Sequence, residues 1–280
     1  MIRGSTFTDN GHLLLSDEER DGLINSFPYV SRFVKKAIGS AEYIRGISRW
    51  CIYIADKDLA DAIKIPDIQK RLQQVSDFRK TSRAECTTEF ANSPHKLKQD
   101  QYRESAAIIA PRVSSERRGY IPCGFVAAGT VILDSAQVIY SPEPWILGVI
   151  SSHMHMVWVR AVAGRLKTDF RYSSALCYNT FPIPALTQKQ KEEIGRHVYG
   201  VLEEREKHPE KTIAQLYDPD KMPMGLKEQH HGLDLAIERC YRSKSFTDDE
   251  ERLEYLFKLY EQMIQEERVR IKEKLVSIYA

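Results

Sequence analysis

The stretch Gly164–Pro184, GRLKTDFRYSSALCYNTFPIP, holds four charged side chains at alternate positions near its beginning. The four are Arg165, Lys167, Asp169 and Arg171. Alternate side chains of an extended segment point to the same face. An extended conformation would therefore place all four charges on one face and Leu166, Phe170 and Tyr172 on the other.

Such a row of basic and acidic side chains carries the hydrogen-bonding groups that reading the base edges of DNA requires. Lys or Arg donates to the O6 and N7 acceptors of guanine, and Asp accepts from the N4 amine of cytosine. Lys167 and Asp169 on one face would suit the two halves of a single G·C pair. The alternative is a solvated edge strand of alternating charge, because charged runs usually lie at the surface.

The composition is that of an ordinary soluble globular protein, with 42% hydrophobic and 29% charged residues in 280. This length suits one large domain or two smaller ones. No apolar run reaches the length of a membrane span, and the first residues lack the apolar core of a signal peptide. Five scattered cysteines without a CxxC pair argue against a disulfide framework or a zinc site and indicate a reducing cytoplasm.

The net charge of +2 is unevenly distributed. Residues 1–185 hold 24 basic and 19 acidic side chains, whereas residues 186–280 hold 17 and 20. The basic surplus therefore lies in the part that contains the charged stretch. A surplus of this size permits nucleic-acid binding but is not diagnostic of it.

Two further basic segments carry groups suited to phosphate oxygens. The loop Ser114–Arg118, SSERR, combines two hydroxyls with two guanidiniums, and both groups bind phosphates. Its alternative is a polar hairpin loop with surface ion pairs. A helix expected from Pro66 onward is the second segment, and it either lies along phosphates or forms a solvated face. Its basic residues are Lys70, Arg71, Arg79, Lys80 and Arg83. The predicted phosphate contacts are Ser114, Ser115, Arg117, Arg118 and Arg165.

The pattern of elements changes along the chain. Residues 1–184 mix helices with short β-type segments, of which Thr130–Tyr140 is either one strand or a bent pair. Residues 185–280 have the pattern of amphipathic helices alone. The sequence therefore predicts an α/β (α+β) domain over residues 1–184, followed by an all-α helical region over residues 185–280.

The segment Trp145–Gly164 is apolar nearly all round, so we expect it to form one buried helix. His153 and His155 within it stand two residues apart and point to different faces of such a helix. We therefore expect core histidines rather than ligands of a metal ion.

Motifs of catalysis and cofactor binding are missing. The chain holds no GxGxxG and no P-loop, no GxSxG and no NPPY-type tetrapeptide of an amino-methyltransferase. Pro66 and Asp67 are not followed by a plausible ExK metal-binding strand. We therefore expect no catalytic residue, no metal and no cofactor in this chain.

Several strings of the sequence resemble one known family. SSHMHMVWVRAVAGRLKTDFRYSSALCYNTFPIP, residues 151–184, resembles the C-terminal part of MmeI-like restriction–modification enzymes. TDNGHLLLSDEER, RWCIYIAD, VSSERRGYIPCGFV, LYDPDKMP and FTDDEERLEYLFKLYE resemble family segments in the same order. In that family one polypeptide joins a nuclease domain, an N6-adenine methyltransferase, a target-recognition domain and a helical C-terminal region. The resemblance implies that this chain is the recognition portion without the nuclease and methyltransferase domains.

The resemblance further implies sequence-specific reading of double-stranded DNA in the major groove. The family reads bases from positions that match Lys167 and Asp169, working as a pair, and Arg171. Arg112 and the turn at Asp134-Ser135 match other reading positions. S-adenosylmethionine and Mg²⁺ would then bind only to the methyltransferase and nuclease domains, which would be the partners of this chain. The alternative function is a protein–protein docking or assembly module that does not read DNA.

Overall fold

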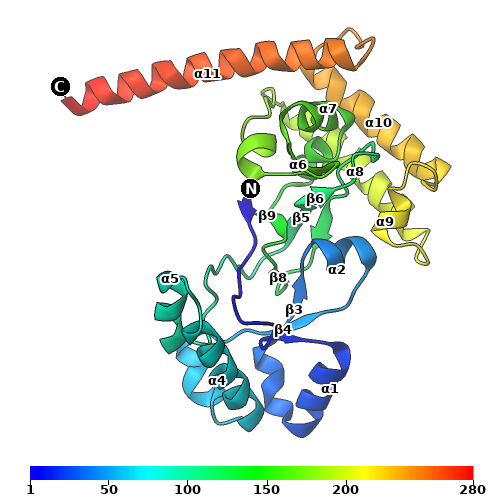
Figure 1. Cartoon of the computed structure of the whole chain (residues 1–280). Coiled ribbons are helices and arrows are strands. Elements are labelled where there is room, and N and C mark those ends of the chain that lie inside the picture. Colours follow the sequence, from blue (N-terminus) through cyan, green and yellow to red (C-terminus); the bar gives the residue numbers. More distant parts are fainter. Residues whose placement is uncertain (280) are drawn as a thin grey trace. The chain divides into compact units, whose positions relative to one another are not determined.

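The computed structural model describes residues 1–279, and their side chains as far as Glu273. The chain divides into two compact units. Unit 1 comprises residues 1–112 and 124–142, and unit 2 comprises residues 113–123 and 143–280. Sheets and helices are mixed up to residue 184, and the described residues after it form helices joined by turns (Figure 1). The predicted fold class is confirmed.

The centre of unit 1 consists of sheets. In its described residues one four-stranded sheet has the order β1 (Ile2–Arg3), β9 (Ala136–Tyr140), β5 (Ala107–Pro111) and β7 (Gly124–Val126), with antiparallel pairs throughout. A second has the order β2 (Leu14–Leu15), β4 (Trp50–Ile52), β3 (Val34–Ile38) and β8 (Val131–Ile132). In this sheet β3 and β8 run parallel. Since β8 and β9 belong to different sheets, Thr130–Tyr140 is a bent pair rather than one strand.

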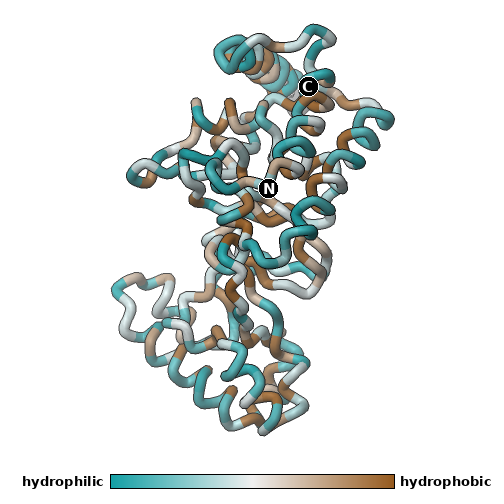
Figure 2. Tube along the Cα trace, turned by 90° about the vertical axis from the view of Figure 1, so that its right-hand side faces the viewer, coloured by the Kyte–Doolittle hydropathy of each residue, from teal (hydrophilic) through white to brown (hydrophobic). Residues whose placement is uncertain are grey.

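Helices and 3-10 turns complete unit 1. They are α1 (Asp17–Ser26), α2 (Ser40–Arg45), α3 (Leu59–Ala62), α4 (Pro66–Lys80), α5 (Glu85–Thr88) and the 3-10 helices Pro28–Phe33, Asp56–Asp58 and Glu89–Asn92. A capping box begins α1, where the Glu19 N–H donates to Ser16 Oγ at 3.2 Å and the Ser16 N–H donates to Glu19 Oε2 at 2.9 Å. Hydrophilic and hydrophobic residues follow one another along the helices (Figure 2), and the apolar side of α4, with Ile68, Leu72 and Val75, is buried in the core of unit 1.

The last turn of α4 contains a buried arginine. Arg79 is 0% exposed, and burial lowers the pKa of its guanidinium below the usual value. Its guanidinium donates five hydrogen bonds of 2.8–3.1 Å to backbone carbonyls. The acceptors belong to Phe7, Thr8, Phe90, Ser93 and Lys96. Arg79 therefore joins the N-terminal segment, α4 and the segment after the 3-10 helix Glu89–Asn92.

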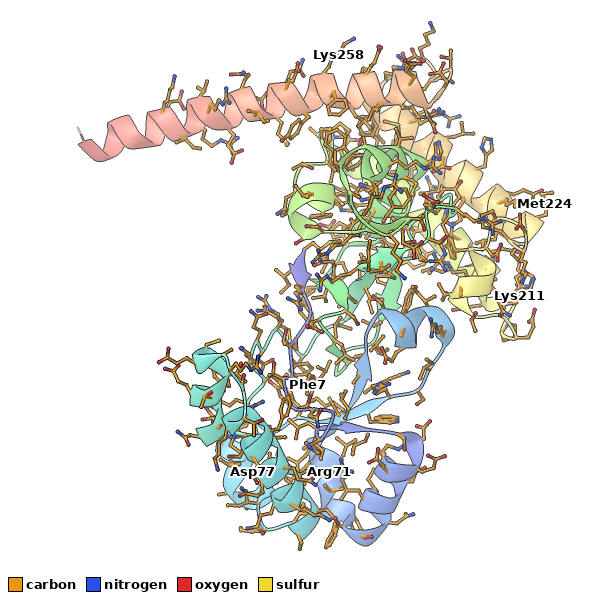
Figure 3. The ribbon with its side chains drawn as sticks, in the orientation of Figure 1. Phe7, Arg71, Asp77, Lys211, Met224 and Lys258 are labelled. Carbon is orange, nitrogen blue, oxygen red and sulfur yellow. The ribbon has the colours of Figure 1, made fainter. Side chains whose placement is uncertain are left out.

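This arrangement corrects the interpretation of the basic helix. Arg79 is unreachable for phosphates, and Arg71 points from α4 toward α1 (Figure 3). Arg71 donates to the His12 carbonyl at 2.9 Å and to the Glu19 carboxylate at 2.8 Å. Lys70, Lys80 and Arg83 are the exposed basic residues of this segment. The sequence could not separate these two groups, because the acceptors of the buried arginine come from segments distant along the chain.

Unit 2 combines a small sheet with helices. Its described sheet has the order β10 (Gly164–Leu166), β11 (Asp169–Arg171) and β6 (Val113–Ser114), all antiparallel. Its helices are α6 (Pro144–Ile150), α7 (His153–Val162), the π-helix Ser174–Tyr178, α8 (Gln188–Glu206), α9 (Ile213–Leu216), α10 (Met224–Tyr241) and α11 (Asp249–Tyr279). α8 packs against both α6 and α10, and α11 packs against α7 (Figure 1). Within residues 1–279 no helix has both the length and the apolar character needed to cross a membrane.

The apolar segment Trp145–Gly164 forms two helices rather than the single helix predicted from the sequence. α6 ends at Ile150 and α7 begins at His153. Between them, the Ser152 hydroxyl caps α7 by accepting from the His155 N–H at 3.2 Å. A serine at this position favours a new helix start over continuation, because its hydroxyl satisfies a backbone donor that would otherwise lack a partner.

Candidate nucleic-acid interface

The charged stretch begins with a tight β-hairpin formed by β10 and β11. Its turn consists of Lys167 and Thr168, and its register pairs Leu166 with Asp169 and Arg165 with Phe170. Lys167 has a φ of 57°, in the left-handed region that residues other than glycine seldom adopt. A positive φ at the first turn position matches the right-handed twist of the flanking strands. The chain therefore reverses direction in the middle of the charged row.

The reversal changes which side chains share a face. Directly opposed residues of an antiparallel pair project to the same face, so Leu166, Asp169 and Arg171 share one face while Arg165 and Phe170 share the other. The Arg165 guanidinium lies 4.2 Å from the centroid of the Phe170 ring. The expected single row of four charges is therefore wrong for Arg165, whereas Asp169 and Arg171 remain together.

The face that carries Asp169 and Arg171 points away from the interior of unit 2. Phe170 and Tyr172, which alternate with them, are 2% and 1% exposed. Lys167 and Arg171 are exposed, and neither side chain has a hydrogen bond or ion pair to another residue of the described part of the chain. Two cationic donors and one half-buried carboxylate acceptor are thus presented together at the turn of the hairpin.

The loop Ser114–Arg118 follows β6 and so lies beside β11 in the sheet. Ser114 is 1% exposed, and its hydroxyl accepts from Arg118 Nη1 at 3.3 Å. Burial lowers the pKa of Arg118, against the opposing influence of the Asp169 carboxylate. Ser115 is half-buried. Ser114 therefore has no surface for an external phosphate in this structure, and Arg118 is partly enclosed between the loop and the hairpin.

Two further guanidiniums near the turn, those of Arg117 and Arg165, are paired with carboxylates. Arg117 forms an ion pair with Asp220, the two side chains being 62% and 69% exposed, and this hydrogen bond raises the pKa of Arg117. Arg165 pairs with Glu116 at 3.3 Å and donates to the Thr168 carbonyl at 3.1 Å, which braces the turn. Ion pairs this exposed stabilise a fold little, so the same guanidiniums remain accessible to a competing anion.

The three upstream residues implied by the resemblance lie together in unit 1. Arg112 Nη1 donates to the Asp134 carbonyl at 2.8 Å, and the Arg112 N–H donates to the Ser135 carbonyl at 3.2 Å. The Asp134 carboxylate forms an ion pair with Arg3. The Ser135 hydroxyl accepts from the Ser40 N–H at 3.0 Å, at the start of α2. Arg112 therefore holds the turn between β8 and β9 that presents Asp134 and Ser135.

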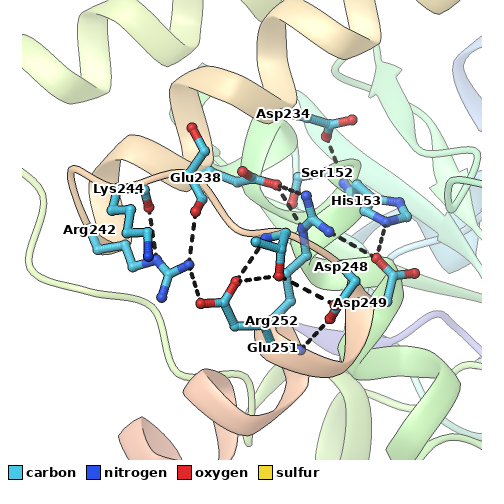
Figure 4. Close-up of polar contacts among 12 residues, drawn as sticks. Ser152, His153, Asp234, Glu238, Arg242, Lys244, Asp248, Asp249, Glu251 and Arg252 are labelled. Carbon is cyan, nitrogen blue, oxygen red and sulfur yellow. Dashed lines mark hydrogen bonds and ion pairs between the residues drawn. The ribbon is translucent and has the colours of Figure 1, made fainter.

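A polar network within unit 2 joins α7, α10 and α11 around the buried Asp234. Asp234 of α10 accepts from the Tyr120 hydroxyl and from the His153 N–H, each at 2.7 Å. Burial raises the pKa of Asp234 to about 6. The His153 Nε2 lies 2.7 Å from Asp249 Oδ1 (Figure 4). Sequence reasoning missed this network, because its members stand up to 129 positions apart and follow no local pattern.

The two neighbouring histidines have different surroundings. His155 is 0% exposed, its Nε2 lies 2.9 Å from the Tyr172 hydroxyl oxygen, and burial lowers its pKa to about 3. His153 is partly exposed and paired with Asp249, so the expectation of a core histidine holds for His155 alone. Among the side chains that the structure describes, no group of three or more potential ligands is arranged for a metal ion.

The change from a mixed α/β part to helices alone coincides with the boundary between two matched protein families, both of restriction–modification enzymes. A family model of the MmeI target recognition domain matches residues 1–185, and a model of the MmeI C-terminal domain matches residues 186–266. The chain therefore belongs to the MmeI family and comprises these two domains.

Known relatives extend well beyond this chain. DNA methyltransferase A of Bacillus subtilis (strain 168) is 43% identical over 260 residues, which cover 93% of this chain and 30% of that protein. A solved structure of the type IIL restriction-modification enzyme MmeI in complex with DNA has a TM-score of 0.90 and is 34% identical. The match covers 94% of this chain and 35% of that one. This chain thus spans about a third of the length of these relatives.

Proposed function

We propose that this chain recognises a specific sequence in duplex DNA by placing the β10–β11 hairpin in the major groove. The observation that carries the proposal is the outward presentation of Lys167, Asp169 and Arg171 on a hairpin whose other face is packed. The major groove of B-DNA admits a two-stranded β-ribbon. Membership of a target-recognition family, and a relative solved in complex with DNA, support this function.

Each of the three side chains has a role that follows from its hydrogen-bonding groups. Lys167 and Arg171 are donors alone and would contact O6 and N7 of guanine, whereas Asp169 is an acceptor and would contact N4 of cytosine. Only Thr168 separates Lys167 from Asp169 in the turn. We therefore assign these two side chains to the two halves of a single G·C pair. Each such contact contributes about 1–3 kcal/mol of discrimination.

A second reading surface is proposed for the turn between β8 and β9. Asp134 and Ser135 are at its exposed corner, and Arg112 fixes the corner through the Asp134 carbonyl. We assign these three residues to a further base pair, on the strength of the family resemblance. The internal hydrogen bonds of Arg112 favour a role in holding the turn at least as much as in direct contact.

The phosphate contacts are proposed for the loop and the edge of the hairpin. Arg117 and Arg165 would exchange the carboxylates of Asp220 and Glu116 for phosphate oxygens of the DNA backbone, where closely spaced charges and the release of bound counterions favour binding. Ser115 and Arg118 would add to this contact from the same loop. These contacts would position the hairpin in the groove without conveying sequence information.

The wider role that we propose is that of the specificity part of a bifunctional restriction endonuclease and N6-adenine DNA methyltransferase. The identity with DNA methyltransferase A supports this role. Methylation of an adenine requires the base to leave the stack, which a methyltransferase domain would carry out with S-adenosylmethionine. The chain itself would hold no catalytic residue, no S-adenosylmethionine and no Mg²⁺. Its partners would be double-stranded DNA and the catalytic domains, in the cytoplasm.

Selection of bound sequences from a random duplex pool, at two salt concentrations, tests the function. We expect enrichment of a motif that contains a defined G·C pair, with affinity falling linearly with salt on logarithmic axes. Absence of any DNA binding would favour the docking-module alternative. Calorimetric titration with S-adenosylmethionine tests the cofactor assignment, because measurable binding would contradict it.

A further inference from the structure

Leu166 places a large apolar side chain on the outward face of the hairpin. It is 53% exposed and stands directly opposite Asp169 in the register of β10 and β11. Arg171 projects to the same face two residues further along β11. A leucine therefore stands among the groups to which we assign base reading.

The direction of this side chain is fixed by the fold. A two-residue turn sets the register of a hairpin, and a register slip of one residue would expose Phe170, which is 2% exposed. Arg165, the neighbour of Leu166 in β10, lies over the Phe170 ring on the other face. Leu166 therefore cannot turn inward without breaking the packing of its neighbour.

An outward leucine at this position is unusual for its surroundings. Exposed leucines are common in general, but β10 is an edge strand of its sheet. Edge strands usually carry charged side chains that prevent pairing with another chain. The charged residues Arg165, Lys167 and Asp169 surround Leu166, yet this one position is apolar. An apolar partner on the ligand would explain the exception.

We propose, on the basis of the function proposed above, that Leu166 reads the C5-methyl group of a thymine. This methyl is the apolar group that a base presents in the major groove. The Cβ atoms of directly opposed residues lie about 5 Å apart, and successive base pairs are about 3.4 Å apart. The thymine therefore belongs to the base pair next to the one read by Asp169.

The test removes the two apolar groups separately and together. The probes are duplexes that carry the site selected from the random pool, with each thymine replaced in turn by uracil, which lacks only the methyl. The proteins are the unaltered chain, Leu166→Ala, and Leu176→Ala as a matched control, since Leu176 is 51% exposed but lies in the π-helix Ser174–Tyr178.

For the unaltered chain and Leu176→Ala, we expect one thymine-to-uracil exchange to weaken binding about fourfold, the effect of one methyl group. For Leu166→Ala, the same exchange should leave the affinity unchanged. A site in which no thymine behaves in this way would overturn the inference. So would a Leu166→Ala variant that binds all sequences equally less well, because this pattern indicates a wedge between base steps.

The outcome for the proposed function is separate. Sequence-selective binding that survives in all three proteins supports the function even where the methyl effect is missing. If the unaltered chain binds DNA without any sequence preference, the proposed function is wrong, and so is the role of Leu166.

Discussion

The Arg165 guanidinium lies 4.2 Å from the centroid of the Phe170 ring, on the face of the hairpin opposite to Asp169. The six paired residues of the hairpin thus have a packed face, with Arg165 and Phe170, and an outward face, to which we assign DNA binding. Phe170 is packed in the interior, and Arg165 covers it from the solvent side. Substitutions on the outward face should therefore alter binding without unfolding unit 2.

Exchanging the charges of the proposed reading pair should change one position of the recognised site. The double variant Lys167→Glu with Asp169→Arg reverses donor and acceptor while keeping the net charge, so long-range attraction for DNA is unchanged. We expect site selection to return a different base pair at one position and the same bases elsewhere, because each contact discriminates by about 1–3 kcal/mol. The exchange Glu254→Lys with Lys258→Glu on α11 serves as a control. An unaltered site from the hairpin variant would refute the assignment.

The turn conformation of Lys167 predicts that a glycine at this position increases the stability of the fold but weakens DNA recognition. Its left-handed φ of 57° costs a residue with a side chain about 1–2 kcal/mol, and glycine avoids this cost. Lys167→Gly should therefore raise the free energy of unfolding by about 1 kcal/mol while losing discrimination at one base pair. Lys167→Ala should lose the same discrimination without gaining stability. Urea denaturation and competition binding measure the two effects, and equal stabilities for Gly and Ala would contradict the strain.

The ion pair of Arg117 predicts opposite effects for its two partners. Asp220 occupies the guanidinium that we assign to a phosphate, so Asp220→Asn should tighten binding to all sequences alike. Arg117→Ala should weaken binding to all sequences and lower the slope of log affinity against log salt by about one. Fluorescence anisotropy with one specific and one unrelated duplex distinguishes the cases. An effect of Arg117→Ala that is confined to one sequence would count against a phosphate contact.

Because the guanidinium of Arg79 is buried, its removal should lower the stability of the fold strongly. It should not change the number of cationic groups that contact DNA. Arg79→Met removes five hydrogen bonds to buried or half-buried backbone carbonyls, so we expect the free energy of unfolding to fall by at least about 3 kcal/mol. Lys80→Met, on the exposed side of the same helix, should hardly change stability. The salt slope of DNA binding should be the same for folded Arg79→Met as for the unaltered chain. A smaller slope of log affinity against log salt for this variant would indicate that Arg79 contacts a phosphate.

The raised pKa of Asp234 predicts a component of stability that falls as the pH rises. Its pKa is about 6 in the fold because of burial, and about 4 in an unfolded chain. Between these values the folded state binds more protons at Asp234, so stability decreases toward higher pH. His155 acts in the opposite direction, because burial lowers its pKa to about 3. The groups that face Asp234 are Tyr120, His153 and Glu238.

The substitution Asp234→Asn removes the pH-dependent stability that comes from Asp234 and leaves that from His155. Its free energy of unfolding in urea should therefore rise more steeply between about pH 4 and pH 6 than that of the unaltered chain. The comparison of slopes is independent of any uniform loss of stability caused by the altered hydrogen bonds. Parallel curves for the two proteins would show that Asp234 does not titrate in this range.

Local sequence rules predicted the parts of the fold that local interactions determine. The helix expected from Pro66 onward is α4, which has this proline in its first turn. The alternation of charged and apolar residues indicated β structure in the charged stretch, where β10 and β11 lie, and the change in element pattern along the chain indicated the fold class. The break at Ser152 was overlooked because the flanking residues are continuously apolar, although serine is a frequent N-cap.

Other features depend on contacts that no local pattern reveals. The turn at Lys167 and Thr168 lacks the glycine or asparagine that usually marks a two-residue hairpin, so the stretch looked like one extended segment. Arg79 resembled a surface residue of an amphipathic helix, because its five acceptors come from segments up to 72 positions away. The base-reading and phosphate assignments, and the domain boundary at residue 184, remain predictions.

The alternation of packed and outward residues in the hairpin has a consequence for how this family diversifies. Residues that pack in the interior and residues that we assign to DNA reading alternate along the strands, so each set can be substituted separately. A lineage can therefore exchange outward side chains one at a time while every intermediate stays folded. On the proposed function, single substitutions on the outward face would therefore give new target sequences while the packed face of the hairpin stays unchanged.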